Sequence, residues 1–564
     1  MIGISWLMIF CRKASMWGLF FLLLVSGSVQ GAAPNAAGIA SAHPLATEAG
    51  REVIEAGGNA FDAAVAVSAA LAVVEPYSSS LGGGGFWLLQ RASDGRQVML
   101  DGRERAPLAA HRDLYLDEAG EVVPGRSIDG ALAAGIPGEP AALVHLAEHY
   151  GRLPLSRSLA PAIRLARDGF PVDRHYRRMA EWRLDALRSS PAAAGQFLHD
   201  WEIPAEGELI RQPDLASTLQ LLADKGRDGF YAGELAQRLV KGVRDAGGIW
   251  SLQDLQQYQV VEREPIRGRY GELKIISAAP PSSGGVVLVT MLNILEGFQI
   301  DNLPRVQRVH LMIEAMRRAY RDRADYLGDP DFVDMPLQAL THPWYAAGLA
   351  RDIQLERATP STPQPVSKAT EGADTTHFSI IDREGNRVAA TLSINYPFGA
   401  AFVPAGTGVL LNDEMDDFSA RPGVPNVYGL VGGEANAIGP GKRMLSSMSP
   451  TFVESDAGVA MLGTPGGSRI ISMVLLAILE LADGQPIAQW VRQPRFHHQY
   501  LPDRVEYEAG AFDDKTVTEL QSMGHILHRL EREYGNMQAL YWDRRSGQVT
   551  GASDPRGSGR TVIW

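Results

Sequence analysis

A threonine-led segment near the middle of the chain carries the residue types of an amide-cleaving nucleophile. From residue 374 it reads D-T-T-H-F-S-I-I-D-R-E-G-N-R-V-A-A-T-L-S-I-N. Alternating side chains over 376–381 and 388–394 predict two strands joined by a hairpin turn. Cleavage between Asp374 and Thr375 would give Thr375 a free α-amine beside its hydroxyl. Because an α-amine titrates at roughly pH 7.7 to 8.0, it can serve that hydroxyl as general base.

The stretch before this hairpin has the composition of an exposed tether. Residues 357–373 read R-A-T-P-S-T-P-Q-P-V-S-K-A-T-E-G-A, which is rich in Pro, Ser and Thr and has almost no large apolar side chain. We expect such a segment to be exposed and poorly ordered. A tether that leads directly into a buried strand would be explained by a cleavage site before Thr375. From the tether and hairpin alone, however, an ordinary linker before an ordinary hairpin is the favoured interpretation.

The composition is that of a globular chain and argues against nucleic acid as a partner. The 564 residues are 45% hydrophobic and 21% charged, which suffices for a large core. The formal net charge is −12, and no dense run of Lys or Arg occurs.

The first 31 residues have the layout of a secretory signal. Arg12 and Lys13 precede an apolar run at 16–25, which is followed by small residues. The run is shorter than the roughly 17 to 25 residues of a spanning helix. We therefore predict a secreted or periplasmic protein without stable membrane insertion. The single cysteine, Cys11, lies in this segment, so the mature chain is expected to contain no disulfide.

Hydrophobic periodicity predicts alternating helices and strands. Helices are expected over 45–56, 60–74, 138–149, 159–168, 286–296, 306–327, 471–481 and 511–524, and strands over 86–90, 97–100, 273–278 and within 538–564. Paired strands flanked by helices favour a layered α/β arrangement.

Two local patterns allow more than one interpretation. Four glycines at 82–85 precede F-W-L-L without a Gly-Lys-Ser/Thr sequence, so close backbone packing is favoured over a phosphate loop. The charged run R-R-A-Y-R-D-R at 317–323 is interpreted as the solvated face of a helix.

Nine motifs, in order along the chain, resemble those of γ-glutamyltranspeptidases. They are G-G-N-A-F-D-A-A-V-A (57–66), L-G-G-G-G-F (81–86), D-G-R-E-R-A-P (101–107), P-P-S-S-G-G (280–285), T-T-H-F-S (375–379), L-N-D-E-M-D-D-F-S (411–419), P-G-V-P-N-V-Y-G-L (422–430), L-S-S-M-S-P-T (445–451) and T-P-G-G-S-R-I (464–470). The resemblance implies an α/β fold, a four-layer αββα sandwich of the N-terminal-nucleophile hydrolase type. It also implies a signal peptide (1–31), a large subunit (32–374) and a small subunit (375–564), the last two forming one body as a heterodimer of the chain's own fragments.

The resemblance assigns roles to individual residues. They are the nucleophile Thr375, its support Ser393, the oxyanion-hole amides of Gly466 and Gly467, a carboxylate clamp of Arg103, Ser446 and Ser447, the ammonium acceptors Asn395, Glu414 and Asp417, and Tyr428 at the centre of a lid over 422–433. Taken alone, the two glycines are better explained by a tight turn, and only their place in the ordered motifs favours the oxyanion hole. Arg103 also suits a surface ion pair with Glu104 or Asp101. Asp413, where relatives often have Asn, has no role in this scheme.

The implied activity is cleavage of γ-glutamyl amides such as glutathione through an ester on Thr375. The acyl group then passes to water, an amino acid or a peptide, and no cofactor or metal is implied. One alternative is an acylase for glutaryl-type amides, including cephalosporins. Another is a catalytically silent secreted binding protein, against which the retained nucleophile and both clamps argue.

Overall fold

The computed structural model describes residues 31–361 and 375–564. The predicted signal segment up to residue 30, the greater part of the predicted tether, and Asp374 of the predicted cleavage site lie outside the described residues. Within the two described ranges, no helix has both the length and the apolar character needed to cross a bilayer.

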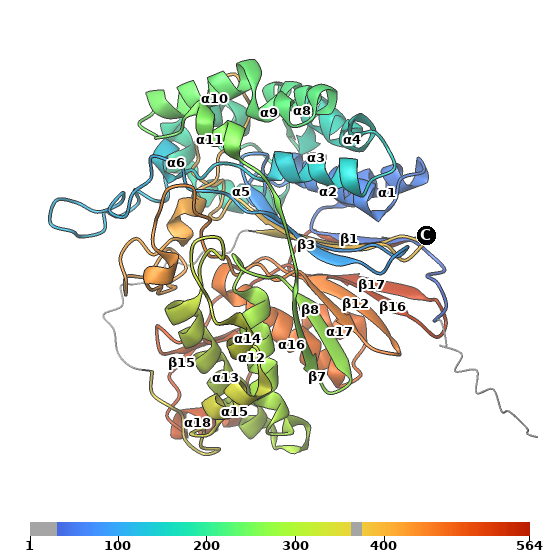
Figure 1. Ribbon diagram of the computed structural model, residues 1–564, viewed down its shortest axis with the longest axis vertical. Coiled ribbons are helices and arrows are strands. Elements are labelled where there is room, and N and C mark those ends of the chain that lie inside the picture. The colour runs from blue at the N-terminus through green and yellow to red at the C-terminus, as the bar shows by residue number, and fades with distance from the viewer. Residues whose placement is uncertain (1–30, 362–374) are drawn as a thin grey trace, which may run out of the picture.

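Two antiparallel sheets lie face to face at the centre of the molecule (Figure 1). The first sheet has the order β18-β1-β9-β10-β2-β3-β6, and the second has the order β17-β16-β12-β11-β8-β7. The strands are β1 (Gly38–Ser41), β2 (Gly84–Gln90), β3 (Gln97–Gly102), β6 (Val261–Arg263), β7 (Ile266–Tyr270), β8 (Leu273–Ser277), β9 (Thr376–Ile381), β10 (Arg387–Ser393), β11 (Thr451–Glu454), β12 (Gly458–Gly463), β16 (Gln538–Asp543), β17 (Val549–Ser553) and β18 (Arg560–Ile563).

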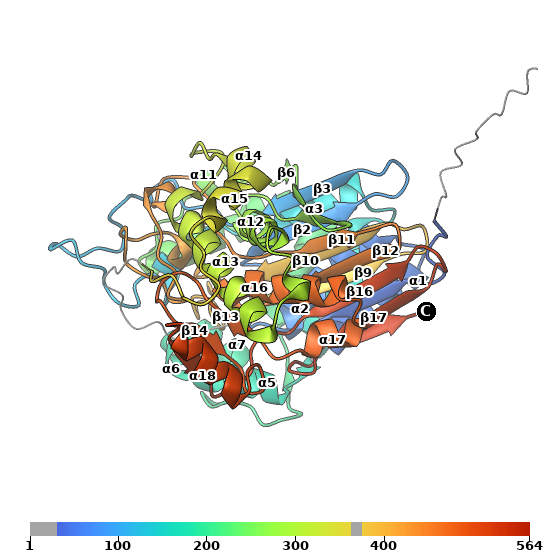
Figure 2. The same ribbon diagram turned by 90° about the horizontal axis from the view of Figure 1, so that it is seen from below.

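Helices cover the outer face of each sheet, so the predicted four-layer αββα sandwich is confirmed (Figures 1 and 2). The first helical layer contains α1 (Pro44–Glu55), α2 (Ala60–Val74), α3 (Glu139–His149), α4 (Leu155–Asp168), α8 (Pro213–Lys225) and α10 (Gly233–Asp245). The second contains α12 (Gly284–Glu296), α13 (Arg305–Tyr326), α16 (Ile470–Ala482) and α17 (Ile487–Arg492). Shorter elements are α5 (Arg174–Trp182), α6 (Leu184–Ser189), α7 (Pro191–Phe197), α9 (Asp228–Tyr231), α11 (Leu252–Gln257), α14 (Leu337–Leu340), α15 (Pro343–Ala350), α18 (Asp514–Ser522), β4 (Phe170–Pro171), β5 (Leu209–Ile210), β13 (Phe496–His497), β14 (Val505–Tyr507) and β15 (Leu527–Arg529).

The two cores follow from the alternation of side chains along the strands. In β2, Trp87 and Leu89 pack toward the first helical layer, whereas Phe86 and Leu88 pack between the two sheets. Helix α2 is buried at every position, which accounts for its Ala- and Val-rich sequence. Each side chain of β2 therefore packs into only one of the two cores, and neighbouring residues pack into different ones.

Segments from before and after residue 375 alternate within both sheets. Strands β9 and β10 lie between β1 and β2, and β11 pairs with β8. Both large sheets contain strands from each part of the chain, so the two parts form a single body. Where the chain is cut remains a prediction.

The predicted solvated face at 317–323 is wrong. Arg317, Arg318 and Arg323 on α13 are buried, each with 4 to 5% of its surface exposed. Arg317 and Arg318 share the buried Glu314 one turn earlier, and they also pair with Asp503 and Asp352, respectively, so each guanidinium has carboxylate partners. Among the described residues, Arg323 forms no such pair and contacts Ser447 instead.

Candidate active site

The hairpin of β9 and β10 brings the two predicted hydroxyls together. Its register pairs Thr376 with Leu392, so Thr375 and Ser393 meet one position further along. Thr375 Oγ1 lies 3.3 Å from Ser393 Oγ, and the Asn395 N–H donates to the same Ser393 oxygen at 2.9 Å. Ser393 therefore sits between the predicted nucleophile and the backbone of the next predicted site residue.

The glycine run packs directly against this hairpin. Gly84 pairs with Ser393 across β2 and β10. A Cβ placed on Gly83 would lie 2.3 Å from the Ser393 carbonyl oxygen, which is far inside van der Waals contact. The close backbone packing predicted for 82–85 is confirmed, and it occurs beside the site.

The Gly466–Gly467 turn has a backbone shape that only glycine adopts readily. Their φ angles are +144° and +55°. A Cβ on Gly467 would lie 2.7 Å from the Tyr428 ring. Among the described residues, neither amide N–H of this pair has a hydrogen-bond acceptor. The turn therefore offers two adjacent donors, as an oxyanion hole requires.

A buried guanidinium links the two predicted clamps. Arg103 is only 1% exposed, which excludes the surface ion pair considered from the sequence. Its Nη1 lies 2.5 Å from Glu414 and its Nη2 lies 2.6 Å from Asp417. Its Nε donates to the Met444 carbonyl at 3.2 Å. The predicted anion-binding cation thus contacts two of the predicted ammonium acceptors.

The carboxyl groups around this guanidinium outnumber it. Glu104 is a third, 3.6 Å from Arg103 Nη1. Burial raises the pKa of Glu414 to about 7, against the opposing pull of Arg103. Burial, followed by the Glu414 charge, also raises the pKa of Glu104. Both shifts favour the neutral carboxyl, so an added cation such as an ammonium group would lower these pKa values and be paired with the carboxylates that form.

Arg323 contacts one of the predicted clamp serines, a contact that the sequence analysis missed. Its Nη2 donates to Ser447 Oγ at 3.2 Å and its Nε donates to Ser283 Oγ at 2.9 Å. It forms no ion pair among the residues described, and burial lowers its pKa. A usable signal was the apolar stripe of Met316, Ala319 and Tyr320, which places position 323 on the inward face of α13.

Ser446, the other predicted clamp serine, is held by contacts of its own loop. Ser446 Oγ accepts the Met448 N–H at 3.1 Å, and the Ser446 N–H donates to the Pro281 carbonyl at 2.8 Å. This ties residues 446–448 to the P-P-S-S-G-G motif that precedes α12.

Asp413 has a structural role that the sequence did not reveal. The Asn395 side-chain amide donates to the Asp413 carbonyl at 3.1 Å and to its Oδ2 at 3.2 Å, and the Tyr396 N–H donates to Oδ1 at 2.9 Å. Asn395 has a positive φ of 73°, so these contacts hold it in an uncommon backbone conformation. Burial raises the Asp413 pKa well above its usual value and so favours the neutral carboxyl, which resembles an asparagine amide in shape.

Hydrogen bonds join the predicted lid to the acidic residues 414–417 and to Asn395. Tyr428 Oη donates to the Asn395 carbonyl at 2.5 Å. Asn426 donates to Asp417 Oδ1 at 3.0 Å, and the Val427 N–H donates to Asp416 at 2.9 Å. The cavity below is about 20 Å³, room for roughly one water molecule.

Nearly all of the predicted site converges on that cavity. It is lined by Thr375, Ser393, Gly467, Arg103, Ser446, Ser447, Asn395, Glu414, Asp417 and Tyr428. Of the predicted site residues that the structure describes, only Gly466 is not in its wall.

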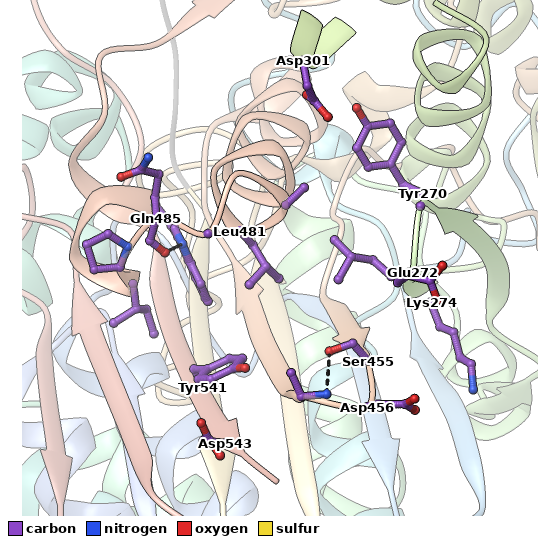
Figure 3. Close-up of a pocket in the computed structure, with 18 of the residues that line it drawn as sticks. Tyr270, Glu272, Lys274, Asp301, Ser455, Asp456, Leu481, Gln485, Tyr541 and Asp543 are labelled. Carbon is purple, nitrogen blue, oxygen red and sulfur yellow. Dashed lines mark hydrogen bonds between the residues drawn. The ribbon is translucent and has the colours of Figure 1, made fainter. Parts of the chain in front are cut away.

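A much larger hollow lies elsewhere (Figure 3). It measures about 1310 Å³ and is lined by Tyr270, Asp456 and Tyr541, among others. It borders the start of β12, whereas Gly466 and Gly467 follow the end of that strand. It contains none of the predicted site residues, so size alone would point to the wrong place.

A threonine hydroxyl at the start of a central strand in an αββα sandwich defines the class of N-terminal-nucleophile hydrolases. The sequence model of gamma-glutamyltranspeptidase matches residues 46–564, and the chain belongs to this family of enzymes.

Individual relatives agree with this assignment. The chain is 46% identical over 492 residues to the glutathione hydrolase proenzyme of Pseudomonas sp. (strain A14), covering 86% of this chain and 85% of that one. It is 42% identical over 525 residues to the protein of the same name from Escherichia coli (strain K12), covering 92% and 90%. A cephalosporin acylase from Bacillus halodurans superposes with a TM-score of 0.83 at 27% identity, covering 99% of both chains.

Proposed function

We propose that this enzyme cleaves γ-glutamyl amides, glutathione among them, and passes the γ-glutamyl group to water or to an amine. The observation that carries the proposal is the placement of Thr375 Oγ1 in one cavity with a buried guanidinium and several carboxyls. A γ-glutamyl group ends in an α-carboxylate and an α-ammonium, which need such a pair of opposite partners. The names of the relatives support the same substrate class.

The substrate would replace contacts that the protein makes with itself. Its α-carboxylate takes the guanidinium of Arg103, bidentately, together with the hydroxyls of Ser446 and Ser447. Its α-ammonium then binds the Glu414 and Asp417 carboxylates, which the guanidinium has released, and the Asn395 side chain. The lid must move for this exchange, because the cavity beneath it is far smaller than a glutamyl group.

The chemistry begins at Thr375. Its hydroxyl attacks the γ-carbonyl and gives up its proton to the α-amine released by cleavage after Asp374. Ser393 orients the attacking oxygen, which its own hydroxyl contacts at 3.3 Å. The amides of Gly466 and Gly467 stabilise the oxyanion, and collapse of the intermediate leaves a γ-glutamyl ester on Thr375 and a free amine.

Processing and export belong to the same proposal. The relatives are named proenzymes, which supports cleavage into fragments 32–374 and 375–564. The N-terminal segment supports export to the periplasm or the medium after removal of residues 1–31.

The second candidate is a glutaryl-type acylase, favoured by the similarity to the Bacillus halodurans cephalosporin acylase. A glutaryl group lacks the ammonium. It would leave the buried carboxyls at 414 and 417 without a cation other than Arg103. The charge of the site therefore favours γ-glutamyl donors.

Glutathione turnover by purified wild-type protein tests the proposal, with Thr375→Ala as the matched control. We expect release of glutamate and cysteinylglycine by the wild type alone. Turnover of a glutaryl amide with no turnover of glutathione would replace the proposal by the acylase.

A further inference from the structure

The loop that follows β10 has an unusual run of backbone conformations. Residues 395–401 read N-Y-P-F-G-A-A, and the φ angles of Asn395, Phe398, Gly399 and Ala401 are +73°, +57°, +51° and +50°. Glycine adopts such angles freely, whereas they are uncommon for other residues, above all for a bulky one such as Phe. Such conformations persist only where neighbouring groups impose them, and they gather at functional sites.

The 395–401 loop begins at a residue of the active site. Asn395 lines the cavity beneath the lid, where its side chain is proposed to bind the α-ammonium of the donor. Its backbone carbonyl accepts the hydroxyl of Tyr428 in the lid. The place of the Asn395 side chain therefore depends on the conformation of the loop that it begins.

Arg183 holds the middle of this loop from the part of the chain before residue 375. It lies at the junction of α5 and α6. Its Nε donates to the Pro397 carbonyl at 2.9 Å, and its Nη2 donates to the Gly399 carbonyl at 2.9 Å and pairs with Asp129 Oδ1 at 2.7 Å. Its guanidinium also lies 5.1 Å over the Tyr396 ring.

The chemistry of the guanidinium suits this task. Arg183 is only 6% exposed, and its donors form a rigid planar fork. The fork fixes the carbonyls of Pro397 and Gly399 relative to each other, while Asp129 compensates the charge from the outer side, where half of its side chain is exposed. Asp413 holds the start of the same loop, so the strained residues are fixed from two directions.

We propose that Arg183 is a positioning residue for donor recognition, which holds the 395–401 loop in its strained conformation and thereby sets the place of the Asn395 side chain. This inference rests on the proposed function and adds to it a residue that acts on the ammonium end of the donor without touching it. Arg183 is not among the residues that line the cavity beneath the lid, so its effect passes through the loop.

The proposal predicts a selective loss rather than a general one. Without the guanidinium, the loop relaxes toward ordinary negative φ angles and Asn395 leaves the ammonium position. A glutaryl donor has no ammonium and makes no use of Asn395, so its binding to Arg103 and the clamp serines is retained. A merely structural defect would instead lower the amount of active enzyme, which affects both donors equally and cancels in their ratio.

The test measures the ratio of kcat/KM for γ-glutamyl-p-nitroanilide to that for glutaryl-p-nitroanilide on the same preparation, together with KM for the γ-glutamyl donor. Neither quantity depends on the fraction of active enzyme. The variants are Arg183→Gln and Asp129→Ala. The matched control is Arg174→Gln on α5, whose side chain is 89% exposed and pairs with Glu206.

We expect Arg183→Gln to narrow the ratio about tenfold, the order of one hydrogen bond to a charged group, mainly through a higher KM for the γ-glutamyl donor. Asp129→Ala should narrow it about threefold, and Arg174→Gln should leave it unchanged. Adding Ala401→Gly to Arg183→Gln should restore part of the ratio, because glycine keeps a positive φ without support.

An unchanged ratio and KM in Arg183→Gln would overturn the positioning role and leave the proposed function intact. If Arg183→Gln does not fold, the same result in Asp129→Ala overturns the role. If glutaryl turnover is too slow to measure, KM for the γ-glutamyl donor decides alone. A wild type that does not prefer the γ-glutamyl donor would overturn both the role and the proposed function.

Discussion

Arg103 and Glu414 are 311 positions apart in the sequence, yet their side chains pair at 2.5 Å inside the protein. Both are about 1% exposed. A buried ion pair is costly to break on one side only, because the remaining charge loses its partner. A ligand that carries one charge of each sign can separate this pair without leaving either group uncompensated. The pair therefore favours a zwitterionic donor over a simple acid or a simple amine.

The first prediction concerns donor selectivity. A site built for a polar group can reject the analogue lacking it by as much as roughly 10⁴ to 10⁵. We expect kcat/KM for γ-glutamyl amides to exceed that for glutaryl amides by at least about a hundredfold, or roughly 2.7 kcal/mol at about 1.36 per decade. Asp417→Ala should narrow the ratio, because it removes one partner of the ammonium. The measurement uses one chromogenic leaving group for both donors, and equal wild-type rates would contradict the prediction.

The second prediction concerns Arg323. Because its guanidinium holds the Ser447 hydroxyl at 3.2 Å, Arg323→Gln should misplace the carboxylate clamp and raise KM for a γ-glutamyl donor about tenfold. The control is Arg321→Gln on the same helix, whose side chain is 42% exposed and pairs with Asp322. Steady-state kinetics check it. Similar KM values in the two variants would show that Arg323 has no part in donor binding.

The third prediction separates shape from charge at position 413. Asp413→Asn should keep activity within about threefold, because burial already disfavours the charged form of this carboxyl. Asp413→Ala should lower kcat/KM by about a hundredfold. It leaves the Tyr396 N–H and part of the Asn395 amide without an acceptor, at about 1 to 3 kcal/mol for each buried group. An inactive Asn variant with unchanged folding would show that the negative charge is needed.

The fourth prediction is a pH dependence of stability. Burial raises the Glu75 pKa from 4.5 to about 7, with Asp173 adding to the effect. The folded state then holds the proton more tightly than the unfolded state. The protonated Glu75 carboxyl therefore contributes to the free energy of unfolding. This contribution is complete below about pH 4.5 and is lost as the pH rises toward 7. In the uncut Thr375→Ala background, the added change Glu75→Gln should therefore raise Tm more at pH 8 than at pH 5. A difference in Tm that is equal at both pH values would contradict the shift.

Much of the fold was predictable because its signals are local. The buried periodicity of α2 and the alternation through β9 and β10 can be read from neighbouring residues. The contact of Thr375 with Ser393 follows from the same hairpin register. Pairs such as Arg103 with Glu414 have no local signal, and only the order of the motifs placed them in one site. Arg323 was missed because a charged residue on a helix normally indicates a solvated face. Here the guanidinium is buried and donates hydrogen bonds to two serine hydroxyls.

The central claim is that Thr375 becomes an N-terminal nucleophile that carries the acyl group. Intact mass spectrometry of the purified protein, before and after rapid acid quenching with a γ-glutamyl donor, tests it most directly. We predict a fragment with the mass of residues 375–564, beginning T-T-H, that gains one γ-glutamyl group on mixing, while Thr375→Ala stays a single unlabelled chain. A wild-type protein that turns over the donor as one uncut chain, or whose label lies on another residue, would contradict the account.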